Sequence, residues 1–96
     1  MRITGRSMEP ELYAGDFVVV RKVPCGVSSC LRPGDLLVFY QPGYGLLVKR
    51  LESIQPTDRR LVVAGLHPDS ADSRTFGPVD PERVIGRVLW RIHKPR

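Results

Sequence analysis

The chain has 96 residues, with 15 basic and 10 acidic side chains and a formal net charge of +5. Hydrophobic residues make up 42% and charged residues 26%, which is ordinary for a single globular domain over 1–96 and excludes a disordered, collagen-like or disulfide-dense chain. Nine glycines and nine prolines interrupt the sequence, so short strands are expected rather than long helices.

No stretch of the sequence is long and apolar enough to span a membrane. The longest apolar runs, 17–20, 36–40 and 61–66, are far shorter than the ~20 residues that a spanning helix needs. The first residues also lack the apolar segment of a signal peptide. We therefore expect a cytoplasmic protein, or one that reaches a membrane only through a partner or through an anchor missing from this chain.

Turn signals alternate with runs of Val, Leu, Ile and Phe along the chain. In chain order, this pattern predicts strands at 16–22, 35–40, 46–54, 60–66 and 84–93. A short turn or helix is expected within 5–12, and one helical turn at 80–83, with Asp80 as the N-cap and Pro81 in the first position. The predicted fold is mostly β, a small barrel-like domain with at most one or two short helical turns.

The turns that precede two of the predicted strands, which we call the Gly-Asp strand entries, have similar sequences. Segments 12–19 and 31–38 each place Gly-Asp directly before an apolar strand. Glycine permits a tight turn, and the aspartate can accept hydrogen bonds from nearby backbone N–H groups. We expect both strands to begin in the same way.

The excess of positive charge lies at the C-terminal end, in Arg83, Arg87, Arg91, Lys94 and Arg96. A basic end can contact nucleic acid or anionic lipid, but a solvated strand face followed by a frayed tail is the simpler interpretation. The sequence lacks the aromatic residues interleaved with basic ones that single-strand binders use, so no nucleic acid partner is expected.

Two cysteines, Cys25 and Cys30, are separated by four residues, which is not the redox spacing Cys-x-x-Cys. They are interpreted as free thiols, as a disulfide, or as metal ligands with His67 and His93, and the sequence leaves these alternatives open. No spacing favours the metal, so neither a metal nor a cofactor is expected.

Two segments hold candidate catalytic groups. In Gly5-Arg6-Ser7-Met8-Glu9-Pro10, Ser7 lies between a flexible glycine and a proline-stiffened turn. In the second segment, Leu47-Val48-Lys49-Arg50-Leu51, Lys49 shares a strand face with Leu47 and Leu51. Burial on an apolar face would favour a neutral amine, which is a general base. The alternative is that the lysine stem packs while the charged amine reaches water.

A third segment, 70–78, brings hydroxyl groups, a carboxylate and a guanidinium together. It contains Ser70, Asp72, Ser73 and Arg74 and reads on its own as a polar turn. Asp72 and Arg74 could form an ion pair that braces this loop.

Taken together and in order, these segments resemble the type I signal peptidase family. The motifs that carry the resemblance are Ser7-Met8-Glu9-Pro10, Gly34-Asp35, Lys49-Arg50-Leu51 and Ser70-Ala71-Asp72-Ser73-Arg74-Thr75-Phe76-Gly77, with a later likeness at Val84-Ile85-Gly86-Arg87. Because the chain is short and has no visible anchor, it is most similar to the small soluble proteases that remove the propeptide of nickel-type superoxide dismutase.

The resemblance implies a serine endopeptidase with a Ser/Lys dyad, in which Ser7 is the nucleophile and Lys49 the general base. By the same matches, Ser70 would orient the lysine amine, and Asp72 with Arg74 would form a structural ion pair. Ser73 matches the motif without an assigned role. Gly5 stands where some bacterial members have a serine, so the oxyanion would use backbone N–H groups, above all that of Ser7.

The expected partner is a precursor protein, with the nickel superoxide dismutase precursor as the candidate. The main alternative is a signal peptidase or inner-membrane-type peptidase that acts on exported precursors. A self-cleaving repressor domain of the SOS-response type is a further alternative, which would need a cleavable segment ahead of Ser7, where only six residues stand. The alternative from another class is a non-enzymatic β-barrel binding module with a basic C-terminal strand.

Overall fold

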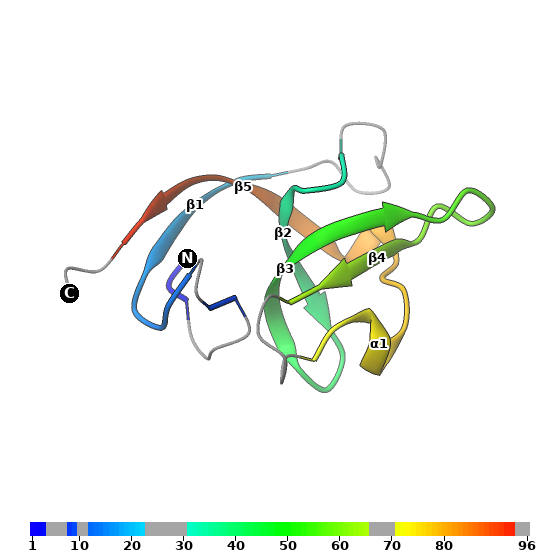
Figure 1. The fold of residues 1–96 in the computed structure, drawn as a ribbon, viewed down its shortest axis with the longest axis horizontal. Helices are drawn as coiled ribbons and strands as arrows, with labels where there is room; N and C mark the ends of the chain where they lie inside the picture. Colours follow the sequence, from blue (N-terminus) through cyan, green and yellow to red (C-terminus); the bar gives the residue numbers. More distant parts are fainter. Residues whose placement is uncertain (4–7, 10–11, 23–30, 66–70, 94–96) are drawn as a thin grey trace.

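A computed structural model describes residues 1–3, 8–9, 12–22, 31–65 and 71–93 (Figure 1). Its five strands are β1 (Phe17–Lys22), β2 (Leu36–Gln41), β3 (Gly45–Ile54), β4 (Leu61–Ala64) and β5 (Val84–Ile92). A four-residue helix, α1 (Ser73–Phe76), and a 3-10 turn, η1 (Pro81–Arg83), precede β5. The prediction of a mostly β fold is confirmed, and each predicted strand lies within two residues of an observed one.

The strands form one antiparallel sheet in the order β1-β5-β2-β3-β4. The sheet is strongly curved in Figure 1, but its edge strands β1 and β4 do not pair with each other among the described residues, so it is open rather than a closed barrel. Both edges meet other segments instead, through single bridges from Arg2 to Phe17 and from Val79 to Leu61. With only four residues, β4 offers little length for a further strand.

Both Gly-Asp strand entries fold as the sequence predicts. Gly15 and Gly34 have φ values of 93° and 98°, a region that favours glycine. A carboxylate oxygen of Asp16 accepts the N–H of Tyr13 at 3.0 Å, and one of Asp35 accepts the N–H of Arg32 at 2.9 Å. The two strands therefore begin with the same turn chemistry.

The helical turn predicted at 80–83 is confirmed as η1. Asp80 is its N-cap and accepts the N–H of Glu82 at 3.1 Å, and Pro81 occupies the first position. The helix α1 lies where the sequence predicted only a polar turn.

The central strand β2 is buried on both faces, which divides the core into two clusters. One side of the sheet carries the first cluster, formed by Leu31, Leu37, Phe39, Leu51, Leu61, Val63, Val79 and Val84. The other carries the second cluster, formed by Ile3, Met8, Leu12, Val18, Leu36, Val38 and Val48.

In the part of the chain that the structure describes, no helix has the length and apolar character to cross a membrane.

Candidate active site

Lys49 lies in β3, directly opposite Leu37 of β2. Strand alternation places its side chain on the same face as Leu47 and Leu51, which belong to the first core cluster or pack against it. The residue is only 1% exposed, so its amine does not reach water as a snorkelling lysine would. Of the two interpretations that the sequence left open for Lys49, the structure shows the buried amine.

This environment changes the protonation of the amine. Burial lowers the pKa of Lys49 below its usual range, because the charged form loses its hydration. The negative charge of Asp72 acts in the opposite direction and raises the pKa, without cancelling the effect of burial. At a given pH, Lys49 is therefore neutral more often than an exposed lysine.

Asp72 is fully buried and is the N-cap of α1. Its carboxylate accepts the backbone N–H of Arg74 at 3.0 Å and that of Gly65 at 3.1 Å. The guanidinium of Arg74 donates two further bonds to it, from Nε at 3.1 Å and from Nη2 at 3.0 Å. Asp72 and Arg74 thus form the ion pair that the sequence suggested, with bidentate geometry. The bond from Gly65 connects the start of α1 to the end of β4.

Asp72 and Arg74 each stabilise the charged form of the other. Burial raises the pKa of Asp72, but hydrogen bonds from Arg74 and Gly65 and the positive charge of Arg74 outweigh it, so the pKa falls below the usual range. The hydrogen bond to Asp72 raises the pKa of Arg74. The Arg74 side chain itself is 72% exposed, so only the carboxylate end of the ion pair is shielded from water.

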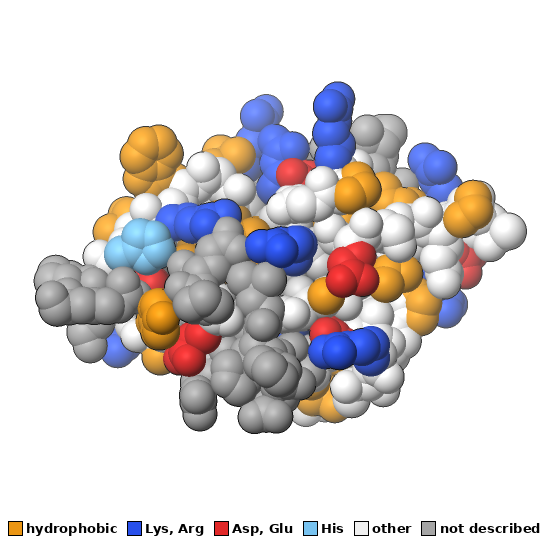
Figure 2. Space-filling model, in the orientation of Figure 1, with side chains coloured by type: hydrophobic (Ala, Val, Ile, Leu, Met, Phe, Trp, Pro, Cys, Tyr) orange, Lys and Arg blue, Asp and Glu red, His pale blue; other side chains and the backbone are white. Residues whose placement is uncertain are grey.

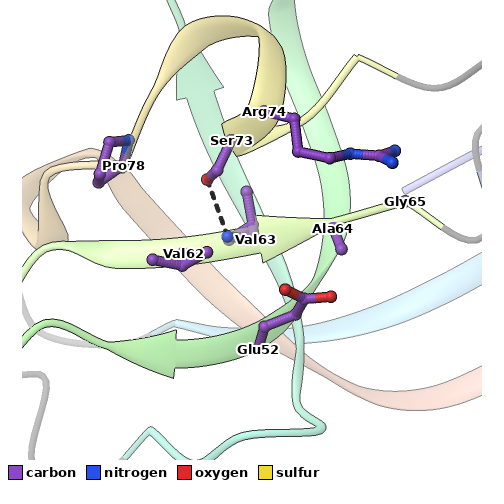
Figure 3. A pocket seen from close by; sticks show the side chains of 8 residues that line it. All are labelled: Glu52, Val62, Val63, Ala64, Gly65, Ser73, Arg74 and Pro78. Atoms are coloured by element: carbon purple, nitrogen blue, oxygen red, sulfur yellow. Dashed lines mark hydrogen bonds between the residues drawn. The ribbon is translucent and has the colours of Figure 1, made fainter.

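Ser73 has a structural role that sequence reasoning missed. Its hydroxyl oxygen accepts the N–H of Val63 at 2.9 Å, as Figure 3 shows. Two neighbouring N–H groups on this edge are also paired, that of Leu61 in β4 with the carbonyl of Val79 and that of Gly65, just after β4, with Asp72. Side chains at the start of α1 thus cover an edge where another strand would otherwise pair. The signal for α1 was Asp72, since aspartate is among the residues favoured at a helix N-cap.

A cavity of about 300 Å³ lies beside β4 and α1 (Figure 3). Its lining residues are Glu52, Val62, Val63, Ala64, Gly65, Ser73, Arg74 and Pro78, and Lys49 is not one of them. This cavity therefore lies next to the loop that supports the site rather than around the buried amine.

A smaller cavity of about 140 Å³ connects the N-terminal segment to β3. Met8 and Val48, the chain neighbours of Ser7 and Lys49, both line it, together with Met1, Ile3, Tyr44, Leu46 and Leu47. Met8 and Val48 also belong to the same buried cluster. The residue that follows Ser7 is thus packed into the cluster that holds the residue preceding Lys49.

Of the five predicted site residues, the structure describes Lys49, Asp72 and Arg74, and Asp72 interacts with each of the other two. Ser7 and Ser70 lie outside the described residues, as do Cys25, Cys30 and His67. Among the described residues, no group of three or more His, Cys, Asp or Glu side chains is arranged to hold a metal ion.

The described part of the site is thus a lysine amine that is buried in a mostly β domain, beside a carboxylate that is paired with an arginine. The family model described as Peptidase S24-like matches residues 1–89. The chain therefore belongs to the Peptidase S24-like family, which supports the serine peptidase class predicted from the motifs. No curated protein and no solved structure matches the chain.

Proposed function

We propose that this protein is a serine endopeptidase in which Ser7 is the nucleophile and Lys49 the general base. The observation that carries the proposal is the buried Lys49 amine, whose pKa is lowered, in a chain of a peptidase family. Further support comes from Met8 and Val48, which share one buried cluster although 40 positions separate them. This packing places the residue after Ser7 against β3 beside the position of Lys49, on the face of the strand opposite the lysine side chain.

In the proposed reaction, the neutral Nζ of Lys49 takes the proton of the Ser7 hydroxyl as Oγ attacks the scissile carbonyl carbon. Backbone N–H groups, including that of Ser7, stabilise the tetrahedral oxyanion. The Lys49 ammonium then donates its proton to the leaving amine, and the acyl group remains as an ester on Ser7. Water, activated by the neutral amine, hydrolyses the ester and restores the serine.

Ser70 is proposed to orient the Lys49 amine, and Asp72 with Arg74 to tune it. The Asp72 carboxylate alone would hold Lys49 in its charged form, because an opposite charge raises the pKa of a lysine. The guanidinium of Arg74 binds that carboxylate with two hydrogen bonds and partly neutralises it. The ion pair therefore helps to keep Lys49 available as a base.

For the substrate, we propose a precursor whose N-terminal propeptide or leader is removed, with the nickel-type superoxide dismutase precursor as the first candidate. The support is the motif resemblance, including Ser7-Met8-Glu9-Pro10 and the segment from Ser70 to Gly77. The protein is proposed to act in the cytoplasm, without a cofactor.

The experiment is to incubate the purified protein with this precursor and to determine the new N-terminus by mass spectrometry. We expect one cut by the wild type and none by Ser7→Ala or Lys49→Arg, with circular dichroism to verify their folding. Cleavage of an exported precursor alone would assign the signal peptidase alternative, and truncation of the protein itself would indicate self-cleavage. If the folded wild type cuts neither precursor nor itself, the peptidase proposal is wrong.

A further inference from the structure

The strands β1 and β5 form a two-stranded ribbon beyond the reach of β2 (Figure 1). Their register places Phe17 opposite Ile92 and Val19 opposite Trp90, so these four side chains share one face. The register shift at this point adds Leu89, which is also exposed. We call these five residues the outer patch; their exposure ranges from 47% to 67%, with Trp90 the highest.

The two faces of this ribbon are covered very differently. On the opposite face, Val18 is buried in the second core cluster, and Val20 and Val88 pack against it. On the outer patch, by contrast, each of the five large apolar side chains is about half exposed or more. Contiguous exposed apolar surface of this kind usually marks an interaction site.

Basic side chains border the outer patch. Arg2 bridges to Phe17 at one end, and Arg21 follows Val19 on the same face at the other, opposite Arg87. Among the described residues, neither Arg2 nor Arg21 forms an ion pair, whereas Arg87 lies 3.8 Å from Asp35. Figure 2 shows hydrophobic and basic side chains adjacent along the outer side of this ribbon.

We propose that the outer patch binds the surface of an anionic lipid bilayer. Tryptophan and other amphipathic aromatic side chains favour the boundary between headgroups and acyl chains, while arginines beside them meet anionic headgroups. A second copy of the chain fits less well, because basic side chains border both ends of the patch and would face basic side chains of the other copy across a two-fold contact. Anionic lipids are enriched in the cytoplasmic leaflet, which agrees with the location expected from the sequence.

The proposal goes beyond peptidase activity and does not depend on it. It requires no spanning helix, since the contact is made by side chains of a sheet face. Trp90 is the only tryptophan of the chain, so its fluorescence reports on the patch directly.

The test uses vesicles of phosphatidylcholine alone and vesicles with about one third phosphatidylglycerol, since anionic lipid supplies the attraction. We expect cosedimentation with the anionic vesicles, a blue shift of Trp90 emission, and weaker binding at high salt. Arg21→Gln should weaken binding about fivefold, because one basic residue near an anionic surface contributes ~1 kcal/mol. Phe17→Ser should weaken it about tenfold or more.

The matched control is Tyr40→Ser, because Tyr40 is 51% exposed but lies on the opposite face of the sheet. This variant should bind like the wild type. Trp90→Ser, followed by cosedimentation, provides a second patch variant if Phe17→Ser does not fold. The proposal is overturned if the wild type does not bind anionic vesicles, or if the patch variants bind these vesicles as well as Tyr40→Ser does. It is equally overturned if the protein forms a dimer that the patch variants dissociate and no vesicle binding is seen.

Discussion

Replacing Asp72 by alanine should destabilise the fold strongly. The change removes the N-cap of α1, which costs ~0.5–2 kcal/mol, and leaves the N–H of Gly65 without its acceptor, which costs ~1–3 kcal/mol. The Arg74 side chain is 72% exposed, so we assign no further loss to its half of the ion pair. The free energy of unfolding should fall by ~2–4 kcal/mol, and the melting temperature by ~10 °C or more.

Urea unfolding at neutral pH, followed by circular dichroism, measures this loss. The matched control is Asp58→Ala, because Asp58 also accepts a backbone N–H, from Arg60 at 3.0 Å, but its side chain is 48% exposed. Asp58→Ala should change the free energy of unfolding by no more than ~0.5 kcal/mol. The reasoning is refuted if both variants lose the same small amount.

The effect of Asp72 should also depend on pH. Because its folded pKa is lowered, Asp72 contributes this electrostatic stability above its unfolded pKa of ~3.9, and the contribution is lost as the pH falls through the folded pKa. The difference between the wild type and Asp72→Ala should therefore shrink on acidification below about pH 4. A difference that stays constant into strong acid would contradict a charged Asp72.

Three further predictions concern its neighbours. Lys49→Met should raise the free energy of unfolding at neutral pH, because a buried lysine with a lowered pKa destabilises the fold at any pH below its unfolded pKa. This gain should vanish as the pH approaches the unfolded pKa of ~10.4. If urea unfolding at neutral pH shows no gain, the prediction is contradicted. Ser73→Ala should lower stability by ~1–2 kcal/mol and speed hydrogen exchange of the Val63 amide, and unchanged exchange would contradict the bond. Arg74→Ala should move the midpoint of the pH–rate profile upward, since Lys49 then faces the unpaired Asp72 carboxylate; a lower midpoint would contradict this coupling.

The sequence predicted the strands well because each is an apolar run bounded by Gly, Pro or Asp. The turns at Gly15 and Gly34 depend only on residues within the turn, and both formed as expected. Closure of the sheet depends instead on contacts between β1 and β4, which are distant in sequence. Local pattern holds no information about that pairing, and the barrel-like expectation was corrected to an open sheet.

For the candidate site, strand alternation placed Lys49 on an apolar face, but it could not decide between a buried amine and one that reaches water. That outcome depends on the residues that cover the face, including Phe76 of α1 and Leu31, which are far from β3 in sequence. The bond from Val63 to Ser73 was missed for the same reason, because it joins an edge strand to a helix that the sequence presented as a turn. The assignment of Ser7 and Ser70 remains a prediction from their motifs.

The most direct test of a neutral lysine base is the pH dependence of kcat/KM for cleavage of a precursor peptide, measured for the wild type and for Lys49→Arg. The activity of the wild type should rise through an apparent pKa well below the ~10.4 of a free lysine, because burial lowers the pKa of Lys49. Lys49→Arg, once circular dichroism has shown that it is folded, should be inactive at every pH, because a guanidinium does not release its proton in this range. Activity of the folded Lys49→Arg protein equal to that of the wild type would contradict the account.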